Sequence, residues 1–127
     1  MSGKSVLLKQ IALVQVMAQI GSYVPADYAF VTICDQIFTR IGSDDDTETD
    51  CSTFQSEMKE IGYILDNVTA KSLVLIDELG RGTSYEVSVG LCFAISEHLI
   101  DSQAFVIFAT HFIFLVQLEK LYLQASK

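Results

Sequence analysis

The chain has 127 residues, half of them hydrophobic, and a formal net charge of −8 at pH 7. This length allows one domain with a single core, and no apolar run approaches the roughly 18 to 20 residues that span a bilayer. The acidic balance argues against this piece alone being a nucleic-acid-binding surface, because phosphate contacts require clustered Lys and Arg. We expect a sheet buried by helices on both faces, or apolar surface that another segment or partner covers.

The first residues have the sequence of the second half of a phosphate-binding loop. Residues 1–5 read MSGKS, the end of the pattern G-x-x-x-x-G-K-[ST]. In that pattern Gly3 lets the backbone approach phosphate, Lys4 supplies a charge to the β and γ phosphates, and Ser5 offers a hydroxyl to Mg²⁺. A bare GKS also occurs by chance. The first glycine of the loop and the strand before it are not in these residues, so we expect a truncated start.

A long helix is expected directly after this loop. Residues 6–19 carry a broad apolar face, and Gly21 followed by Pro25 predicts that the helix ends near Ile20. The N-terminus of this helix would then lie at the bound anion.

Two short strands and an acidic loop are expected next. Residues 30–33 and 37–41 have the alternating apolar pattern of strands near a sheet edge. Residues 42–50 read GSDDDTETD and predict a solvated loop, although the aspartates at 44–46 could alternatively hold a metal ion.

A second helix is expected to begin at Ser52, with Ser52 as its N-cap and Gln55 as the capping-box partner. A helix N-terminus with Ser and Thr is also a possible anion site. One stripe at helical spacing is apolar, so the inner and the exposed faces can be assigned. The inner stripe is Phe54, Met58, Ile61 and Leu65, and the residues expected on exposed faces are Glu57, Lys59 and Glu60.

The chain is organised around the stretch LVLIDELGRGTS at 73–84. Its four apolar residues suit a strand buried on both faces, as in a parallel α/β sheet. Asp77 and Glu78 then follow, and adjacent acids are costly to bury without a cation or a reacting group. In an ATP-hydrolysing site the first acid would serve Mg²⁺ and the second would polarise the attacking water. The alternative is a pair of acids at an exposed strand end.

The last third predicts a helix at 86–99, an apolar strand at 104–109 and a closing helix at 112–123. Thr110 and His111 follow the strand. Ligands of parallel sheets bind at the carboxyl ends of the strands, so His111 can reach the site of Asp77 and sense a γ-phosphate; the alternative is a structural histidine.

The cysteines Cys34, Cys51 and Cys92 are an odd number without C-x-x-C spacing. We expect reduced thiols of an intracellular protein, two of them packing residues, rather than a zinc site or a disulfide framework.

Taken together, these motifs resemble the C-terminal ATPase domain of the MutS proteins, the DNA mismatch-recognition family. The matching stretches keep the order of that domain and cover nearly the whole chain. They are MSGKS at 1–5, AQIGSYVPA at 18–26, IFTRIG at 37–42, STF with EM at 52–58, DELGRGTS at 77–84 and FATHF at 108–112. The resemblance implies a P-loop NTPase of the ABC type with a parallel sheet, spanning residues 1–127 and lacking the strand before the P-loop.

The resemblance also implies ATP and Mg²⁺ as cofactors and gives the matching residues their roles. Within one subunit the phosphates and the metal would be held by Ser2, Gly3, Lys4, Ser5 and Asp77, with Glu78 positioning the water and His111 contacting the γ-phosphate. Across a dimer, Ser52 would reach the partner's nucleotide, and residues 80–83, including Gly80 and Gly82, would line the same interface.

The partners follow from the resemblance alone. The details are most similar to the meiotic branch of the family, homologue four, which pairs with homologue five and acts on DNA in the nucleus, with no membrane partner. DNA contacts would come from domains outside this chain.

Departures from the family pattern favour a second reading of the chain. The GPN that opens the family's loop is absent, its final Thr is Val6 here, and residues 84–88 read SYEVS where small or hydroxyl residues and then an acid-glycine step are expected. The lost backbone N–H groups have no side-chain substitute. The alternative to an ATP-hydrolysing domain is therefore a catalytically impaired fragment that acts at most through dimerisation.

Overall fold

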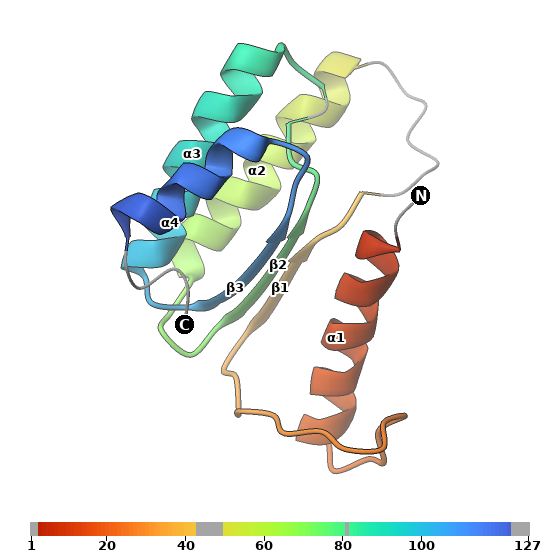
Figure 1. Ribbon diagram of the computed structural model, residues 1–127. Coiled ribbons are helices and arrows are strands. Elements are labelled where there is room, and N and C mark those ends of the chain that lie inside the picture. The colour runs from red at the N-terminus through yellow and green to blue at the C-terminus, as the bar shows by residue number, and fades with distance from the viewer. Residues whose placement is uncertain (1–2, 43–49, 81, 123–127) are drawn as a thin grey trace.

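The computed structural model describes the backbone of residues 3–42, 50–80 and 82–122, and the side chains of these residues except 50–53. Helices lie on both faces of a small parallel sheet (Figure 1). In chain order the elements are α1 (Lys4–Gln19), β1 (Ile37–Arg40), α2 (Asp50–Asn67), β2 (Leu73–Asp77), α3 (Tyr85–Asp101), β3 (Phe105–Ala109), the 3-10 helix η1 (Ile113–Val116) and α4 (Gln117–Leu121). This arrangement confirms the expected mixed α/β class.

The three described strands are parallel and lie in the order β1-β2-β3, so the strand with the carboxylates is central. Leu73 pairs with Ile37 on one side and Phe105 on the other, and Asp77 pairs with Ala109. Every residue of β2 is buried. This burial is the reason for the unbroken apolar run, because a central parallel strand meets helices on both faces.

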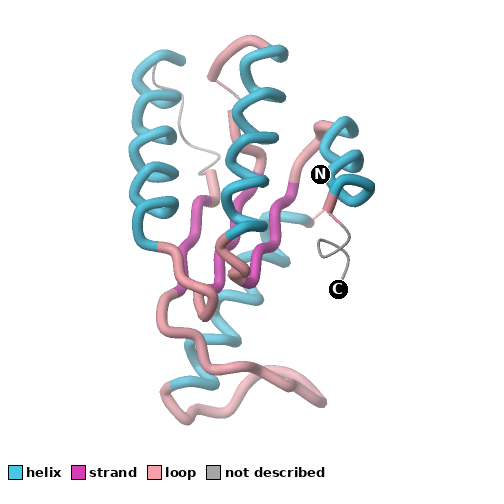
Figure 2. Tube along the Cα trace, turned by 90° about the vertical axis from the view of Figure 1, so that its left-hand side faces the viewer, coloured by secondary structure: helices cyan, strands magenta, loops and turns pink. Residues whose placement is uncertain are grey.

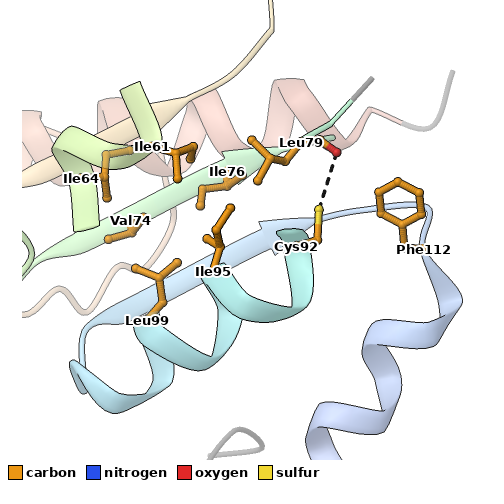
Figure 3. Packing of buried hydrophobic residues seen from close by; sticks show 9 residues of the cluster. All are labelled: Ile61, Ile64, Val74, Ile76, Leu79, Cys92, Ile95, Leu99 and Phe112. Carbon is orange, nitrogen blue, oxygen red and sulfur yellow. Dashed lines mark hydrogen bonds between the residues drawn. The ribbon is translucent and has the colours of Figure 1, made fainter. Parts of the chain in front are cut away.

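Alternation along β2 divides the core into two clusters. Val74 and Ile76 face α2 and α3, where they pack with Ile61, Ile95 and other buried residues; Figure 3 shows this cluster. Leu73 and Leu75 point the other way and pack with Leu8 of α1. The turned view in Figure 2 also places α1 apart from the helices of the opposite face.

The outer edge of β3 borders an open apolar groove. Phe105 donates its N–H to Ser72 and Ala109 accepts from Glu78, so the backbone groups of Val106 and Phe108 point away from β2. A groove of about 1050 Å³ lies there between α1, β3, α3 and α4. Its lining includes Phe105, which is 52% exposed, and Ile107, which is 39% exposed. The chain thus leaves apolar surface uncovered at this edge, the second possibility that its composition allowed.

The end of α1 is where the sequence predicts it. Gly21 has φ 76°, its N–H donates to the carbonyl of Ala18, and the N–H of Ser22 donates to Met17. These two bonds form a Schellman motif, in which a glycine takes the left-handed position after the last helical residue.

Residues 30–33, in contrast, do not form the predicted strand. Their neighbourhood is held to α1 by glutamine side chains instead. Gln15 donates to the carbonyl of Thr32 at 2.7 Å, and Gln19 accepts the N–H of Cys34 at 2.7 Å. Side-chain amides thus take the place of a neighbouring strand. Of the two predicted strands, only the one at 37–41 is confirmed, as β1.

Two helix predictions were also wrong in detail. α2 begins at Asp50, so Ser52 lies inside its first turn and is not the N-cap. In place of the predicted helix at 112–123 the structure has η1 followed by α4. Phe112 is extended, with ψ 96°, and is buried, so the helical segment begins after it. The helix expected at 86–99 is confirmed as α3.

Candidate functional site

The carboxylate of Asp77 lies at the carboxyl end of β2, facing the start of α1. Strand alternation puts Asp77 on the same face as Leu73 and Leu75, the face that α1 covers. Ser5, in the first turn of α1, donates its hydroxyl hydrogen bond to Oδ2 of Asp77, although 72 positions separate the two residues. The fold therefore brings the two residues expected at a metal ion into direct contact.

The second acid meets the second residue of the loop remnant. Nζ of Lys4 forms an ion pair with Oε1 of Glu78 at 3.2 Å. The side chains are 41% and 21% exposed respectively, so both can reach a ligand in solvent. Lys4 and Ser5 are the first two residues of α1, where backbone N–H groups without helical partners attract anions.

One oxygen of Asp77 has no hydrogen-bond partner among the described residues. Asp77 is 7% exposed, and its Oδ1 is buried with no hydrogen bond from the part of the chain that the structure describes. A buried carboxylate oxygen is costly to leave unpaired. Mg²⁺ is bound in nucleotide sites by one or two carboxylates together with phosphate oxygens. The Asp77 carboxylate and the Ser5 hydroxyl therefore fit this cofactor.

The loop after β2 is held in an unusual backbone conformation. Glu78 has φ 43° and Gly80 has φ 87°, while Leu79 between them is fully buried. The N–H of Glu78 donates to the carbonyl of Ala109 at 2.8 Å, and Ser88 donates to the carbonyl of Gly80 at 2.6 Å. A non-glycine residue in the left-handed region is uncommon, and these contacts hold it there.

Glu57 of α2 is a further contact of this loop, and its predicted exposure was wrong. It is 6% exposed, its Oε2 accepts the N–H of Gly80 at 3.0 Å, and its Oε1 lies 3.6 Å from Arg40. The apolar stripe of α2 could not reveal the burial of Glu57, because its hydrogen-bond partner is the N–H of Gly80, 23 residues away in the loop after β2. Burial, with the nearby charge of Glu57 adding to it, raises the pKa of Cys92 to about 11. Cys34 and Cys92 are free and buried, as expected of packing residues.

The other predicted site residues are placed as follows. His111 follows β3 at the same sheet edge; it is exposed, and its ring lies against that of Phe112, tilted by 41°, with centroids 4.3 Å apart. Gly3 precedes α1 with φ 68°, and Gly82 is partly buried. Ser2, the side chain of Ser52 and the aspartates at 44–46 lie outside the described residues.

Neither a cluster of metal-binding side chains nor a membrane-spanning helix is present among the described residues. In that part of the chain, no His, Cys, Asp and Glu side chains gather in groups of three or more that could hold a metal ion. Nor does any described helix combine the length and apolar character needed to cross a membrane.

Comparisons with known proteins place the chain among MutS proteins. Residues 1–127 match the family model of MutS domain V. The chain is 62% identical over 122 residues to the human "MutS protein homolog 4", covering 96% of this chain and 13% of that protein. It is 63% identical over 126 residues to the mouse "MutS protein homolog 4", with coverage of 99% and 13%. A bacterial relative, "DNA mismatch repair protein MutS" of Thermotoga maritima, is 52% identical over 120 residues, with coverage of 94% and 15%.

The chain thus spans about an eighth of the length of the vertebrate relatives that it matches. Since the family model covers all 127 residues, the chain belongs to the MutS family and represents its domain V.

Proposed function

We propose that this chain supplies part of a site that binds and hydrolyses Mg²⁺-ATP in a MutS-family protein acting on DNA. The observation that carries the proposal is the double contact of Ser5 with Asp77 and of Lys4 with Glu78. A chance GKS would have no reason to meet the DE pair at the end of a central parallel strand. This meeting of phosphate-binding and metal-binding residues at a strand end is the arrangement of nucleotide hydrolases.

Three of these residues would hold the nucleotide. Lys4 would bind the β and γ phosphates, and Ser5 and Asp77 would hold Mg²⁺, which when bound neutralises charge on the phosphate oxygens. Lys4 is half-exposed at a helix N-terminus, so it can turn from Glu78 to a phosphate without leaving its helix. The Oδ1 of Asp77, which is buried and has no hydrogen-bond partner within the described residues, supports its assignment to the metal.

Glu78 would then act on the water that attacks the γ-phosphate. The Glu78 carboxylate, which Lys4 contacts in this structure, would accept a proton or a hydrogen bond from that water once Lys4 turns to a phosphate. His111, at the same edge of the sheet, would contact the γ-phosphate from the other strand. Gly80, Gly82 and Ser52 would serve the nucleotide of a partner subunit.

The arrangement of the helices supports a P-loop NTPase fold of the ABC type. α2 and α3 cover one face of the sheet and α1 covers the other (Figure 1). Parallel crossovers are right-handed, so a strand leading into α1 would have to lie beyond β3, along its open edge. That is the position of the strand that the P-loop assignment requires.

The biological setting is part of the same proposal. The similarity to MutS protein homolog 4 supports action in the nucleus during meiotic recombination, as a dimer with another MutS homologue, for which homologue five is our candidate. DNA binding would belong to other domains, since this chain has only 8 Lys and Arg against 16 Asp and Glu.

The proposal is tested by placing residues 1–127 in the matching segment of the mouse relative and changing Glu78→Gln. ATP turnover should fall by about 10²- to 10⁴-fold while ATP affinity is retained, because the phosphate and metal ligands remain. Glu86→Gln is the matched control, since Glu86 is an exposed acid in the first turn of α3. Unchanged turnover in Glu78→Gln would remove Glu78 from this role.

A further inference from the structure

We propose that Glu57 is a positioning residue, which holds the peptide N–H of Gly80 and thereby fixes the direction of the Glu78 carboxylate. The inference rests on the proposed hydrolytic role of Glu78. Glu57 lies in the middle of α2, and the apolar stripe of that helix does not set it apart from the surface acids around it. The structure gives it a different role from theirs.

The contact is a buried, charge-assisted hydrogen bond. Oε2 of Glu57 accepts the N–H of Gly80 at 3.0 Å, with Glu57 6% exposed and Gly80 buried. Hydrogen bonds from a backbone N–H to a carboxylate are stronger than bonds between neutral groups. The α2 helix thus holds the loop that follows β2 at one defined peptide.

A charged partner makes the burial of Glu57 tolerable. A carboxylate is buried at high cost unless it is paired. Arg40, the last residue of β1, lies 3.6 Å from Oε1 of Glu57 and 3.0 Å from Oε2 of Glu60. The Arg40 side chain is 15% exposed and that of Glu60 is 54% exposed. Glu57 is therefore the inner of two acids on Arg40, and the one that reaches the loop.

The loop needs this restraint because its backbone is strained at Glu78. Only Leu79 separates Glu78, at φ 43°, from Gly80, at φ 87°. Residues persist in such conformations only when the surrounding structure over-determines them. The bond from Glu78 to Ala109 fixes one end of the segment, and the bonds of Gly80 to Glu57 and Ser88 fix the other. Loss of the Glu57 bond lets the segment relax, which would turn the Glu78 carboxylate away from its direction.

The test compares three variants in the same grafted protein. Glu57→Met keeps the side-chain length and removes both oxygens, Glu57→Gln keeps one acceptor for Gly80, and Glu60→Gln changes the other acid on Arg40. We expect Glu57→Met to lower kcat by about 10- to 100-fold, the scale of a displacement of about 1 Å in a catalytic group. The ATP dissociation constant should stay within about twofold. Glu57→Gln should recover most of the rate, and Glu60→Gln should match the wild type.

A second measurement separates this inference from the proposed function. Hydrogen exchange of the Gly80 amide should be strongly protected in the wild type and in Glu60→Gln, and much faster in Glu57→Met. Weak protection in the wild type, or an unchanged kcat in Glu57→Met, would overturn the inference. So would an equal loss of rate and affinity in the Gln and Met variants, which indicates general damage. If Glu78→Gln instead leaves turnover unchanged, the hydrolytic role fails while exchange at Gly80 still reports the contact.

Discussion

Gly80 illustrates how single positions of the loop after β2 constrain residue identity. Its φ of 87° favours glycine, and its surroundings exclude anything larger. A Cβ at this position would lie 2.9 Å from both Cβ and Oγ of Ser88. The single proton of the Ser88 hydroxyl is shared between the carbonyl of Gly80, at 2.6 Å, and that of Ser84, at 3.0 Å. The serine therefore cannot move away without losing this interaction.

We therefore expect Gly80→Ala to destabilise the chain by about 1 to 3 kcal/mol, the cost of a strained backbone conformation, with the steric conflict adding to it. Gly90→Ala is the matched control, because Gly90 lies within α3 and an added Cβ there meets nothing within 4 Å. That change should stabilise by about 0.5 to 1 kcal/mol. Urea unfolding measures both, and a Gly80→Ala variant as stable as the wild type would contradict the account.

The sequence predicts the candidate site where the signal is local. Lys4 and Ser5 belong to one short motif and Asp77 and Glu78 to another, so both pairs are predictable without a structure. The contacts between them are consistent with those predictions. The burial of Glu57 was missed because its partner is a backbone N–H in another element. The EM of the family pattern includes Glu57 but gives it no role.

At the scale of elements, β2 and β3 differ in burial, and we expect substitutions in β2 to lower the free energy of unfolding more than those in β3. Every residue of β2 is buried, and the strand contributes to both core clusters. In β3 alternate residues are exposed. The two strands have similarly apolar sequences, so composition alone does not tell the central strand from the one that borders the groove.

Leu75→Ala should accordingly cost about 2 to 5 kcal/mol, the usual cost of removing a buried leucine side chain. Phe105→Ala should cost less than about 1 kcal/mol, as expected for a side chain that is half in solvent. Chemical denaturation of the two variants makes the comparison. Equal losses would mean that the edge of β3 is covered in solution.

The lengths and order of the long helices could be predicted because caps and apolar stripes are local features. The prediction of a strand at 30–33 failed for a non-local reason. Whether an alternating segment becomes a strand depends on a neighbour with free backbone groups, and here the amides of Gln15 and Gln19 take the hydrogen bonds instead.

At the scale of the whole molecule, the proposed nucleotide site and the apolar groove are separate features. The groove runs along the outer edge of β3 and none of Lys4, Ser5, Asp77 and Glu78 lines it. The site lies at the carboxyl edge of the sheet, where the start of α1 meets the end of β2. Composition left open whether the sheet would be fully buried or apolar surface would remain, and the order of the strands shows where such surface lies.

The most direct test of the central claim is the thermal unfolding of the 127-residue chain with and without Mg²⁺-ATP. If Lys4 binds nucleotide, saturation at about 100 times the dissociation constant should stabilise the wild type by about 2.7 kcal/mol, a rise of several degrees in Tm. Lys4→Ala should lose most of that rise, whereas Lys9→Ala, an exposed lysine of the same helix, should keep it. No rise in the wild type, or an equal rise in Lys4→Ala, would contradict the assignment of a nucleotide site to this chain.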